Sequence, residues 1–135
     1  DLKLYYPSHR VILKSSYFVR EALPGNILHG TLGSFIKSKA DVQEKDLQAG
    51  KVPGTHNWGI EPENEKGLLH TEKDGNIVKE YIPTLKGNYM AYYDGMYEAI
   101  RNNKEVPVTG KDAMQVIKVI EAALKSNKER KVIDL

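Results

Sequence analysis

The stretch "GLLHTEKDGNIVKEYIP", residues 67–83, carries the clearest local fold signal in the chain. Asp74-Gly75-Asn76 stands between two runs of residues that favour β-strands. An Asp-Gly pair readily adopts the left-handed backbone that a two-residue hairpin turn requires. The sequence therefore predicts an antiparallel hairpin, and with it a sheet assembled from neighbouring strands.

The residues before position 67 predict more strands of the same kind. In "RVILKSSYFV", residues 10–19, apolar positions alternate with polar ones, which is typical of a strand with one buried face. With "LKLYY" before it and Pro7 and Ser8 between, residues 2–19 are expected to form a hairpin. "NILHGTL" and "SFIK" follow as two strands, with Gly30 and Gly33 at a tight turn between them.

Helical patterns begin with "DVQEKDLQAG", residues 41–50, which loses the alternation and ends in a glycine suited to the residue just past a helix. Residues 51–66 hold two prolines and two glycines and predict a long loop, either functional or a connector. A second helix is expected from Asn88, a suitable N-cap, with an apolar stripe at Tyr89, Tyr93, Met96 and Ile100.

The last part of the chain predicts the longest helix. Thr109 and Asp112 have the spacing of a capping box, and an apolar stripe runs from Ala113 to Leu124. Lys125 and Lys128 stand where they complement the helix dipole. "KVIDL", residues 131–135, is expected to return as a final strand.

Strands followed by amphipathic helices, without a strand–helix–strand rhythm, predict an α+β domain with a largely antiparallel, open sheet and helices packed on one face. The other face of the sheet then needs a partner. Tyr17, Phe18, Ile27 and Tyr81 are among the apolar residues expected on strands. We therefore expect a homo-oligomer through the open sheet face.

Composition limits the class of protein. A chain of 135 residues has the usual size of a single domain, so residues 1–135 are assigned to one domain. The net charge is only +2, and basic and acidic residues are spread evenly, which argues against nucleic acid as a partner. No apolar run is long enough for a membrane span. The absence of cysteine fits a reducing compartment, so a cytoplasmic location is expected.

Several catalytic and cofactor motifs are not supported by the sequence. Gly30 and Gly33 form only G-x-x-G, which lacks the dinucleotide fingerprint. The four histidines lack metal-ligand spacing, and no G-x-S-x-G element accompanies the serines. We assign no catalytic, cofactor-binding or metal-binding residue.

Two groups of residues leave alternatives open. Lys37 and Asp41 could bind a hydroxylated substrate, or they could be a charged strand end and an acidic first helical turn. The tyrosines of residues 89–97 could line a polyol pocket, but such a stripe is more often part of a core.

The run as a whole resembles a known family. "LHGTLGSFIKSKADVQEKDLQAGKVPG…WG", "GNYMAYYDGMYEAI", "PVTGKDAMQVIKVIEAALKS" and "KVIDL" are similar, in that order, to the C-terminal domain of Gfo/Idh/MocA NAD(P)-dependent oxidoreductases. The branch with inositol, sugar and polyol dehydrogenases is the most similar. The resemblance implies the fold of the dihydrodipicolinate reductase and glucose–fructose oxidoreductase C-terminal domains.

The resemblance also implies a division of labour. An N-terminal Rossmann domain would bind NAD or NADP and would be this domain's partner, and the parent enzyme would transfer a hydride from a sugar, inositol or related polyol. The family's E-K-P and D-x-x-x-H motifs have no match in this sequence, so we expect a fragment of a longer oxidoreductase that is inactive alone. Its role would be substrate positioning and oligomerisation. Lys37, Asp41, Gln43 and Trp58 belong to the matched motif and are the substrate-binding candidates, although Trp58 could equally anchor the core.

Two other classes of function stay open. The chain could be a stand-alone binding or oligomerisation module that shares this sheet and has no catalysis. It could also be a small hydrolase that uses His56 with Asp41 or Glu61.

Overall fold

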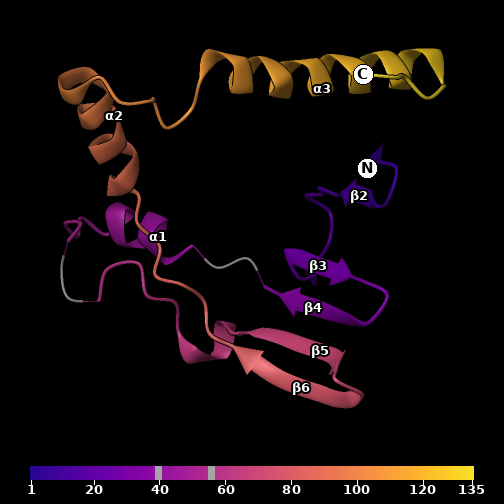
Figure 1. Ribbon diagram of the computed structural model, residues 1–135, viewed down its shortest axis with the longest axis horizontal. Helices are drawn as coiled ribbons and strands as arrows, with labels where there is room; N and C mark the ends of the chain where they lie inside the picture. Colours follow the sequence, from indigo (N-terminus) through magenta and orange to yellow (C-terminus); the bar gives the residue numbers. More distant parts are fainter. Residues whose placement is uncertain (39–40, 55–56) are drawn as a thin grey trace. The chain divides into compact units, whose positions relative to one another are not determined.

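The chain divides into two compact units. A computed structural model describes residues 1–38, 41–54 and 57–135 (Figure 1). One unit comprises residues 1–20 and 95–135, and the other comprises residues 21–94. The helix α2, Met90–Asn102, contributes residues to both. The predicted α+β class with an open antiparallel sheet is confirmed, since each strand pair is antiparallel and three α-helices accompany the strands within the described ranges.

The unit of residues 21–94 is built on a four-stranded sheet. Its order is β3 (Asn26–His29), β4 (Gly33–Lys37), β5 (Gly67–Lys73) and β6 (Asn76–Ile82), each antiparallel to the next. The turn between β5 and β6 is the predicted one: Asp74 and Gly75 both have positive φ, 53° and 75°, and Lys73 pairs with Asn76. The hairpin predicted from the Asp-Gly pair is therefore confirmed.

The predicted turn between β3 and β4 is also confirmed, for a different physical reason. Gly30 N–H donates to the carbonyl of Gly33 at 2.8 Å, which closes the turn. Gly33 is needed because a Cβ there would lie 2.5 Å from the side chain of Thr71 on β5. Close approach of two strands, and no special dihedral angle, excludes a side chain at this position.

The helix α1, Val42–Gln48, follows β4 and confirms the short helix expected there. Its N-cap is Asp41, and Gly50 has the positive φ, 75°, that the end of the helix requires. A 3₁₀ turn at Glu63–Glu65 interrupts the loop that leads to β5. Asn88 Oδ1 accepts from the N–H of Met90 at 3.0 Å, as expected of a cap for α2.

The unit of residues 1–20 and 95–135 contains the hairpin of β1 (Leu2–Tyr5) and β2 (Arg10–Leu13). The predicted second strand is wrong beyond Leu13. Ser16 Oγ accepts from the N–H of Phe18 at 3.2 Å, which offers the backbone a turn in place of a strand ladder. Tyr17 and Phe18 are 98% and 97% exposed, so the prediction that they lie on a strand is also wrong.

The helix α3, Gly110–Glu129, starts with the predicted capping box. Asp112 N–H donates to Thr109 Oγ1 at 3.1 Å, and Thr109 N–H donates to Asp112 Oδ2 at 3.1 Å. The helix ends at Arg130, which adopts a left-handed conformation with φ 54°. The final strand expected at residues 131–135 does not form. Ser126 Oγ instead donates to the Lys131 carbonyl at 2.6 Å, which ties the start of the tail to the end of α3.

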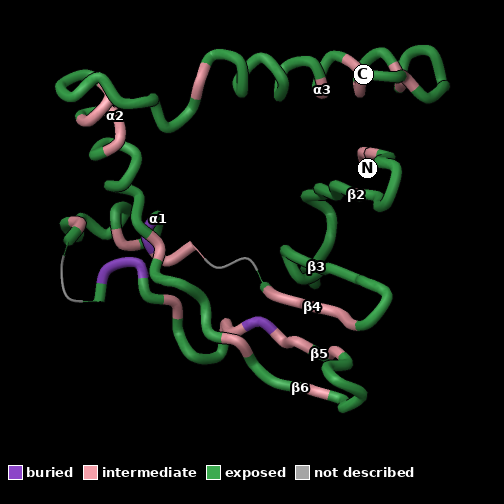
Figure 2. The backbone as a smooth tube through the Cα atoms, in the orientation of Figure 1, coloured by how far each residue is buried: buried purple, intermediate pink, exposed green. Residues whose placement is uncertain are grey.

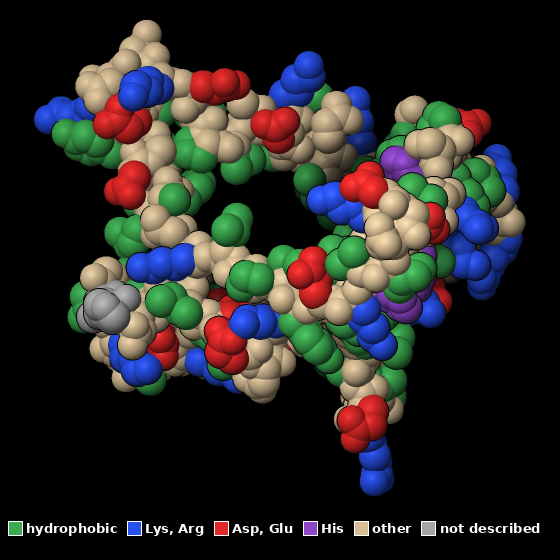
Figure 3. All heavy atoms as spheres, turned by 60° about the horizontal axis from the view of Figure 1, so that its bottom comes forward, with side chains coloured by type: hydrophobic (Ala, Val, Ile, Leu, Met, Phe, Trp, Pro, Cys, Tyr) green, Lys and Arg blue, Asp and Glu red, His purple; other side chains and the backbone are tan. Residues whose placement is uncertain are grey.

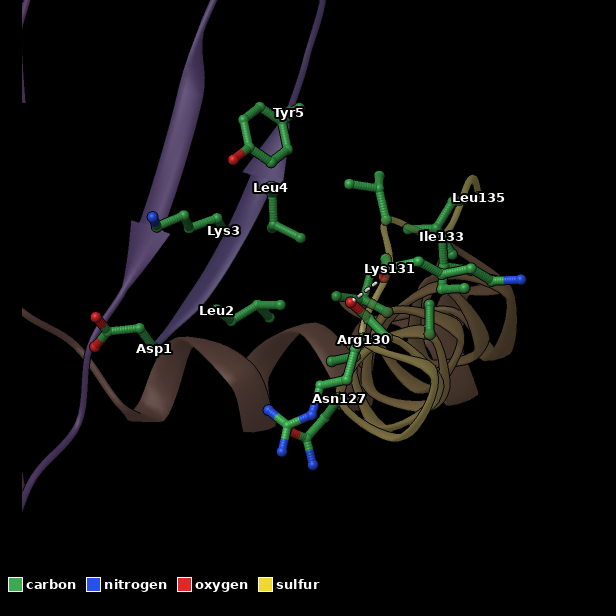
Figure 4. Close-up of a pocket in the computed structure, with 15 residues that line it drawn as sticks. Asp1, Leu2, Lys3, Leu4, Tyr5, Asn127, Arg130, Lys131, Ile133 and Leu135 are labelled. Atoms are coloured by element: carbon green, nitrogen blue, oxygen red, sulfur yellow. Dashed lines mark hydrogen bonds between the residues drawn. The ribbon is translucent and has the colours of Figure 1, made fainter.

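The tail and β1 enclose a cavity of about 560 Å³ with the C-terminal half of α3. Leu2 and Leu4 of β1 extend toward α3 and the tail, whereas the amine of Lys3 points away from them (Figure 4). The cavity is therefore lined mainly by aliphatic side chains.

Few residues are fully buried in the described part of the chain. Buried positions are confined to α1, the loop around Trp58 and the start of β5 (Figure 2). Tyr92, Tyr93 and Tyr97 of α2, which were expected to be core residues, are at least half-exposed. Most of the large apolar side chains in the stripe of α3 are also exposed. Hydrophobic side chains lie at the surface among charged groups of both signs (Figure 3). None of α1, α2 and α3 is long and apolar enough to cross a bilayer.

Candidate functional site

The amide of Gln43 joins three segments of the unit of residues 21–94. Asp41 caps α1 by accepting at Oδ1 from the N–H groups of Gln43 and Glu44, at 3.1 and 3.2 Å. This cap fixes the first turn, in which Gln43 is buried. Gln43 Oε1 accepts from Trp58 Nε1 at 3.0 Å and from the N–H of Tyr89 at 2.9 Å. One oxygen thus links α1, the loop and the start of α2.

Two glycines complete this arrangement by direct contact of their backbones. Gly87 N–H donates to the Gly59 carbonyl at 2.9 Å. Gly59 has φ 72°, and a Cβ there would overlap the Gly87 carbonyl. A Cβ on Gly87 would lie 2.6 Å from Gln43 Nε2. We call the group of Gln43, Trp58, Gly59, Gly87 and Tyr89 the glutamine clamp.

A carboxylate and a phenol meet at the edge of the glutamine clamp. The hydroxyl of Tyr89 donates to Asp41 Oδ2. This hydrogen bond, together with partial burial and the negative charges of Asp41 and Glu44, raises the pKa of the Tyr89 phenol above its ordinary value. Tyr89 therefore stays a hydroxyl through the neutral range.

A partly buried ion pair joins the end of β4 to the loop that leads to β5. Lys37, the last residue of β4, donates from Nζ to Glu61 Oε2 at 2.6 Å and to the Glu65 carbonyl at 2.8 Å. The side chains of Lys37 and Glu61 are only 12% and 15% exposed. Burial raises the pKa of Glu61, but hydrogen bonds from Lys37 and Thr84 and the charge of Lys37 outweigh it. The pKa of Glu61 is therefore below its ordinary value.

These groups surround a small cavity of about 260 Å³. Its lining residues come from α1, the loop after Trp58 and the segment before α2: Asp41, Val42, Gln43, Gly59, Glu61, Thr84, Leu85, Gly87 and Tyr89. Ligand pockets of proteins usually have volumes of about 300–1,000 Å³, so only a small molecule would fit. Carboxylate, amide and hydroxyl groups in one small space are suited to binding the hydroxyls of such a molecule.

The four predicted substrate-binding residues all lie in this region, but in different roles. Asp41 and Gln43 line the cavity, and Lys37 is paired with the lining residue Glu61. Trp58 is 3% exposed and lies behind Gln43, where its indole N–H is occupied. Contact with substrate stays a prediction for each. His56, the candidate base of the hydrolase alternative, lies outside the described residues.

Sequence reasoning missed Glu61 and Thr84 as part of this site. The sequence indicates Glu61 only as a partner of His56 in the hydrolase alternative, and it carries no signal for Thr84. Glu61 is 24 residues from Lys37 in the sequence, so no local spacing could indicate the pair. For Tyr89 the sequence left open a place in a polyol pocket or in a helical core stripe, and the structure places it in the lining of the cavity.

The described residues do not fit a dinucleotide or a metal ion. All strand pairs there are antiparallel, so the described part of the chain forms no parallel strand–helix–strand crevice for a dinucleotide. Within the described ranges no three side chains of His, Asp or Glu converge on one point that could hold a metal.

Comparison with known proteins places the chain in a family. Residues 3–135 match the family of oxidoreductases named Gfo/Idh/MocA, in its C-terminal alpha/beta domain. The chain therefore belongs to the C-terminal domain of this oxidoreductase family, and the resemblance seen in the sequence is confirmed.

Two curated relatives match almost the whole chain. Scyllo-inositol 2-dehydrogenase (NADP(+)) IolW of Bacillus subtilis is 37% identical over 134 residues, which are 99% of this chain and 37% of the relative. The oxidoreductase YdgJ of Escherichia coli is 33% identical over 132 residues, which are 98% of this chain and 38% of the relative. The chain thus spans less than two fifths of the length of these relatives.

Solved structures agree with the fold. The oxidoreductase YvaA of Bacillus subtilis superposes with a TM-score of 0.93 at 36% identity, over 98% of this chain and 40% of that one. The YPO2259 oxidoreductase of Yersinia pestis gives a TM-score of 0.91 at 33% identity, over 98% of this chain and 38% of that one.

Proposed function

We propose that this chain is the substrate-positioning and assembly domain of an NAD(P)-dependent oxidoreductase that acts on a sugar, an inositol or a related polyol. The observation that carries the proposal is the match of residues 3–135 to the family's C-terminal domain. A relative that is 37% identical over 99% of this chain is a scyllo-inositol dehydrogenase, which supports a cyclic polyol as the substrate class.

The chain's own residues are suited to holding hydroxyl groups. Asp41 and Glu61 are acceptors on the wall of the small cavity, and Thr84 and Tyr89 add hydroxyls that can donate or accept. The glutamine clamp fixes the loop and the start of α2, so these groups lie on a rigid frame. Lys37 holds Glu61 in its ionised form.

The cofactor would be bound by another part of a longer polypeptide, because the described residues do not fit it. When bound, the nicotinamide accepts a hydride from the carbinol carbon of the substrate. The contribution of this chain is to bind and orient the polyol. A Rossmann domain of the same polypeptide is the proposed intramolecular partner.

Assembly is the second proposed role. The four-stranded sheet exposes Ile27, Ile77 and Tyr81 on one face, which is the surface that we propose pairs with a second copy. A cytoplasmic location is proposed with it, because the chain contains no cysteine.

The test begins with the coding sequence upstream of Asp1. A reading frame with a dinucleotide fingerprint would be expressed whole and assayed for NAD(P)H formation with inositols and sugars. Activity with a polyol is expected, and Asp41→Asn should raise KM more than it lowers kcat. Asp46→Asn, on the same helix but in an exposed ion pair with Lys51, is the matched control and should change neither.

Failure of every polyol and sugar as a substrate would contradict the proposed substrate class. A start codon immediately before the Asp1 codon would contradict the oxidoreductase role and favour the alternative, a stand-alone binding or oligomerisation module.

A further inference from the structure

The small cavity beside the glutamine clamp has acidic walls, and its described lining holds no basic side chain. The two charged lining residues are Asp41 and Glu61. Their carboxylates are close enough for the charge of Asp41 to oppose the ionisation of Glu61. An anionic group of a ligand would meet the same repulsion in this space.

Lys37 does not offer the cavity a positive charge that could bind an anion. Its ammonium group has three N–H bonds, which donate to Glu61 Oε2 at 2.6 Å, the Glu65 carbonyl at 2.8 Å and the Ser38 carbonyl at 3.5 Å. The Lys37 side chain is also largely buried. Lys37 therefore orients Glu61, and its donors are used within the fold.

Asp41 uses most of its acceptor capacity inside the fold. Its Oδ1 accepts from the N–H groups of Gln43 and Glu44, and its Oδ2 accepts from the hydroxyl of Tyr89. A carboxylate has about four lone-pair sites, so most of those of Asp41 are taken. The same cap occupies N–H groups at the start of α1 that could otherwise attract an anion.

Glu61 is placed differently. Among the described residues it accepts from two donors, the ammonium of Lys37 and the hydroxyl of Thr84. About half of its lone-pair sites are then left for a ligand. Its side chain lines the cavity, and donors from β4 and from the segment before α2 hold it in place. Glu61 is therefore an acceptor that is oriented before any ligand enters.

We propose that Glu61 determines the specificity of this site, because its carboxylate accepts hydrogen bonds from substrate hydroxyls and repels anionic substrates. The inference rests on the proposed function and narrows the substrate class to neutral sugars and polyols, without sugar phosphates and sugar acids. A hydroxyl donates well to a carboxylate. A phosphate or a second carboxylate brings like charge into a space whose described lining holds no cation.

The test uses the complete polypeptide that contains this chain and measures NAD(P)H formation at about pH 8, well above the ordinary carboxyl pKa. The probes are inositols and glucose, each compared with an anionic counterpart, an inositol monophosphate or glucuronate. We expect kcat/KM to be at least about 100-fold higher for the neutral substrate, because like charges brought together strongly oppose binding.

Glu61→Gln keeps the size of the side chain and removes its charge. We expect KM for the neutral substrate to rise about 10-fold with kcat nearly unchanged, as for the loss of one hydrogen bond to a charged group. The preference over the anionic substrate should fall by a similar factor. Glu63→Gln, in the same loop with a side chain that is 87% exposed, is the matched control and should change neither.

Lys37→Met separates substrate binding from support of the fold. It breaks the same ion pair as Glu61→Gln but keeps the carboxylate, so the preference for neutral substrates should remain. Lys37→Met combined with Glu61→Gln leaves neither charge unpaired and should reproduce the loss of preference. This double variant keeps the test decisive if circular dichroism shows that Glu61→Gln alone does not fold.

Equal kcat/KM for neutral and anionic substrates in the wild type would overturn the charge selection and leave the proposed oxidoreductase function intact. Wild-type KM and preference in Glu61→Gln would overturn the role of Glu61. The same changes in Glu61→Gln and Lys37→Met would also overturn it and leave a purely structural ion pair. Oxidation of no sugar or polyol, neutral or anionic, would overturn the proposed function and this inference with it.

Discussion

The amide oxygen of Gln43 accepts from two donors that lie at least partly buried, Trp58 Nε1 and the N–H of Tyr89. Replacing Gln43 with Leu keeps a side chain of similar size but removes this acceptor. A buried donor without an acceptor costs about 1–3 kcal/mol, so we expect Gln43→Leu to lower the free energy of unfolding by about 2 kcal/mol or more.

The measurement is urea denaturation followed by the fluorescence of Trp58, which is the chain's single tryptophan. Gln48→Leu is the matched control, because Gln48 is on the same helix but is exposed. We expect it to change the free energy of unfolding by less than about 0.5 kcal/mol. Equal effects of the two substitutions would contradict the role given to the clamp.

The ion pair of Lys37 and Glu61 makes stability depend on pH. The pKa of Glu61 is lowered in the folded chain, so its contribution to stability is present above the ordinary carboxyl pKa and is lost as the pH falls through the folded value. Lys37→Met removes the hydrogen bond and the positive charge that lower the pKa of Glu61, whereas the burial that raises it remains. We therefore expect the pKa of Glu61 to rise in this variant. Carboxyl titration by NMR measures this directly.

Lys51→Met is the control for that titration, since Lys51 pairs with Asp46 at an exposed position. It should leave the pKa of Glu61 unchanged. If the titration of Glu61 is the same in Lys37→Met and in the wild type, the ion pair is not what lowers it.

Single residues also show which structural roles could be predicted from the sequence and which could not. The sequence placed Asp41 in an acidic first helical turn, and the structure makes it the N-cap of that helix, a role that depends on neighbours within four residues. The environment of Trp58 was left open between a sugar-stacking ring and a core anchor. Its burial depends on Gln43, 15 residues away, and on no local pattern.

At the scale of elements, the capping box of α3 gives a prediction. Thr109→Ala removes the hydroxyl that accepts from the N–H of Asp112, and the loss of such a cap costs about 1 kcal/mol. Asp112→Ala should cost a similar amount, and the double substitution less than the sum, since each residue satisfies the other's backbone.

Thermal or urea unfolding of the four proteins in this cycle measures the coupling. Lys118→Ala, at an exposed position within α3, is the control and should stay within about 0.5 kcal/mol of the wild type. Additive effects of Thr109→Ala and Asp112→Ala would show that the box does not act as a unit.

The elements that the sequence predicted well are those fixed by short-range chemistry. The Asp74-Gly75 turn, the glycine after α1 and the cap of α3 each depend on a few adjacent residues. The strand expected beyond Leu13 had suitable periodicity, and a final strand was expected at the tail, but neither segment pairs with a strand in the described part of the chain. Alternation describes the faces of a strand and does not supply the hydrogen bonds that a strand needs.

On the scale of the whole molecule, the described part of the chain buries little of its apolar surface. The stripe of α3 was predicted correctly as a pattern, yet Val116, Ile117 and Leu124 are exposed. Periodicity identifies the apolar side of a helix but not what covers it. The chain spans less than two fifths of the length of two relatives. Other parts of a polypeptide of that length are available to cover the apolar side of α3.

The glutamine clamp has a consequence for the order of folding. Gln43 and Tyr89 are 46 residues apart in the sequence, whereas β5 and β6 are joined by a two-residue turn. Closing the longer loop costs more chain entropy, so we expect the hairpin to form before the transition state and the clamp after it. Gln43→Leu should therefore accelerate unfolding and leave the refolding rate nearly unchanged in stopped-flow measurements. A slower refolding rate of Gln43→Leu would contradict this order. If the order holds, the glutamine clamp limits the unfolding rate and so determines the lifetime of the folded state.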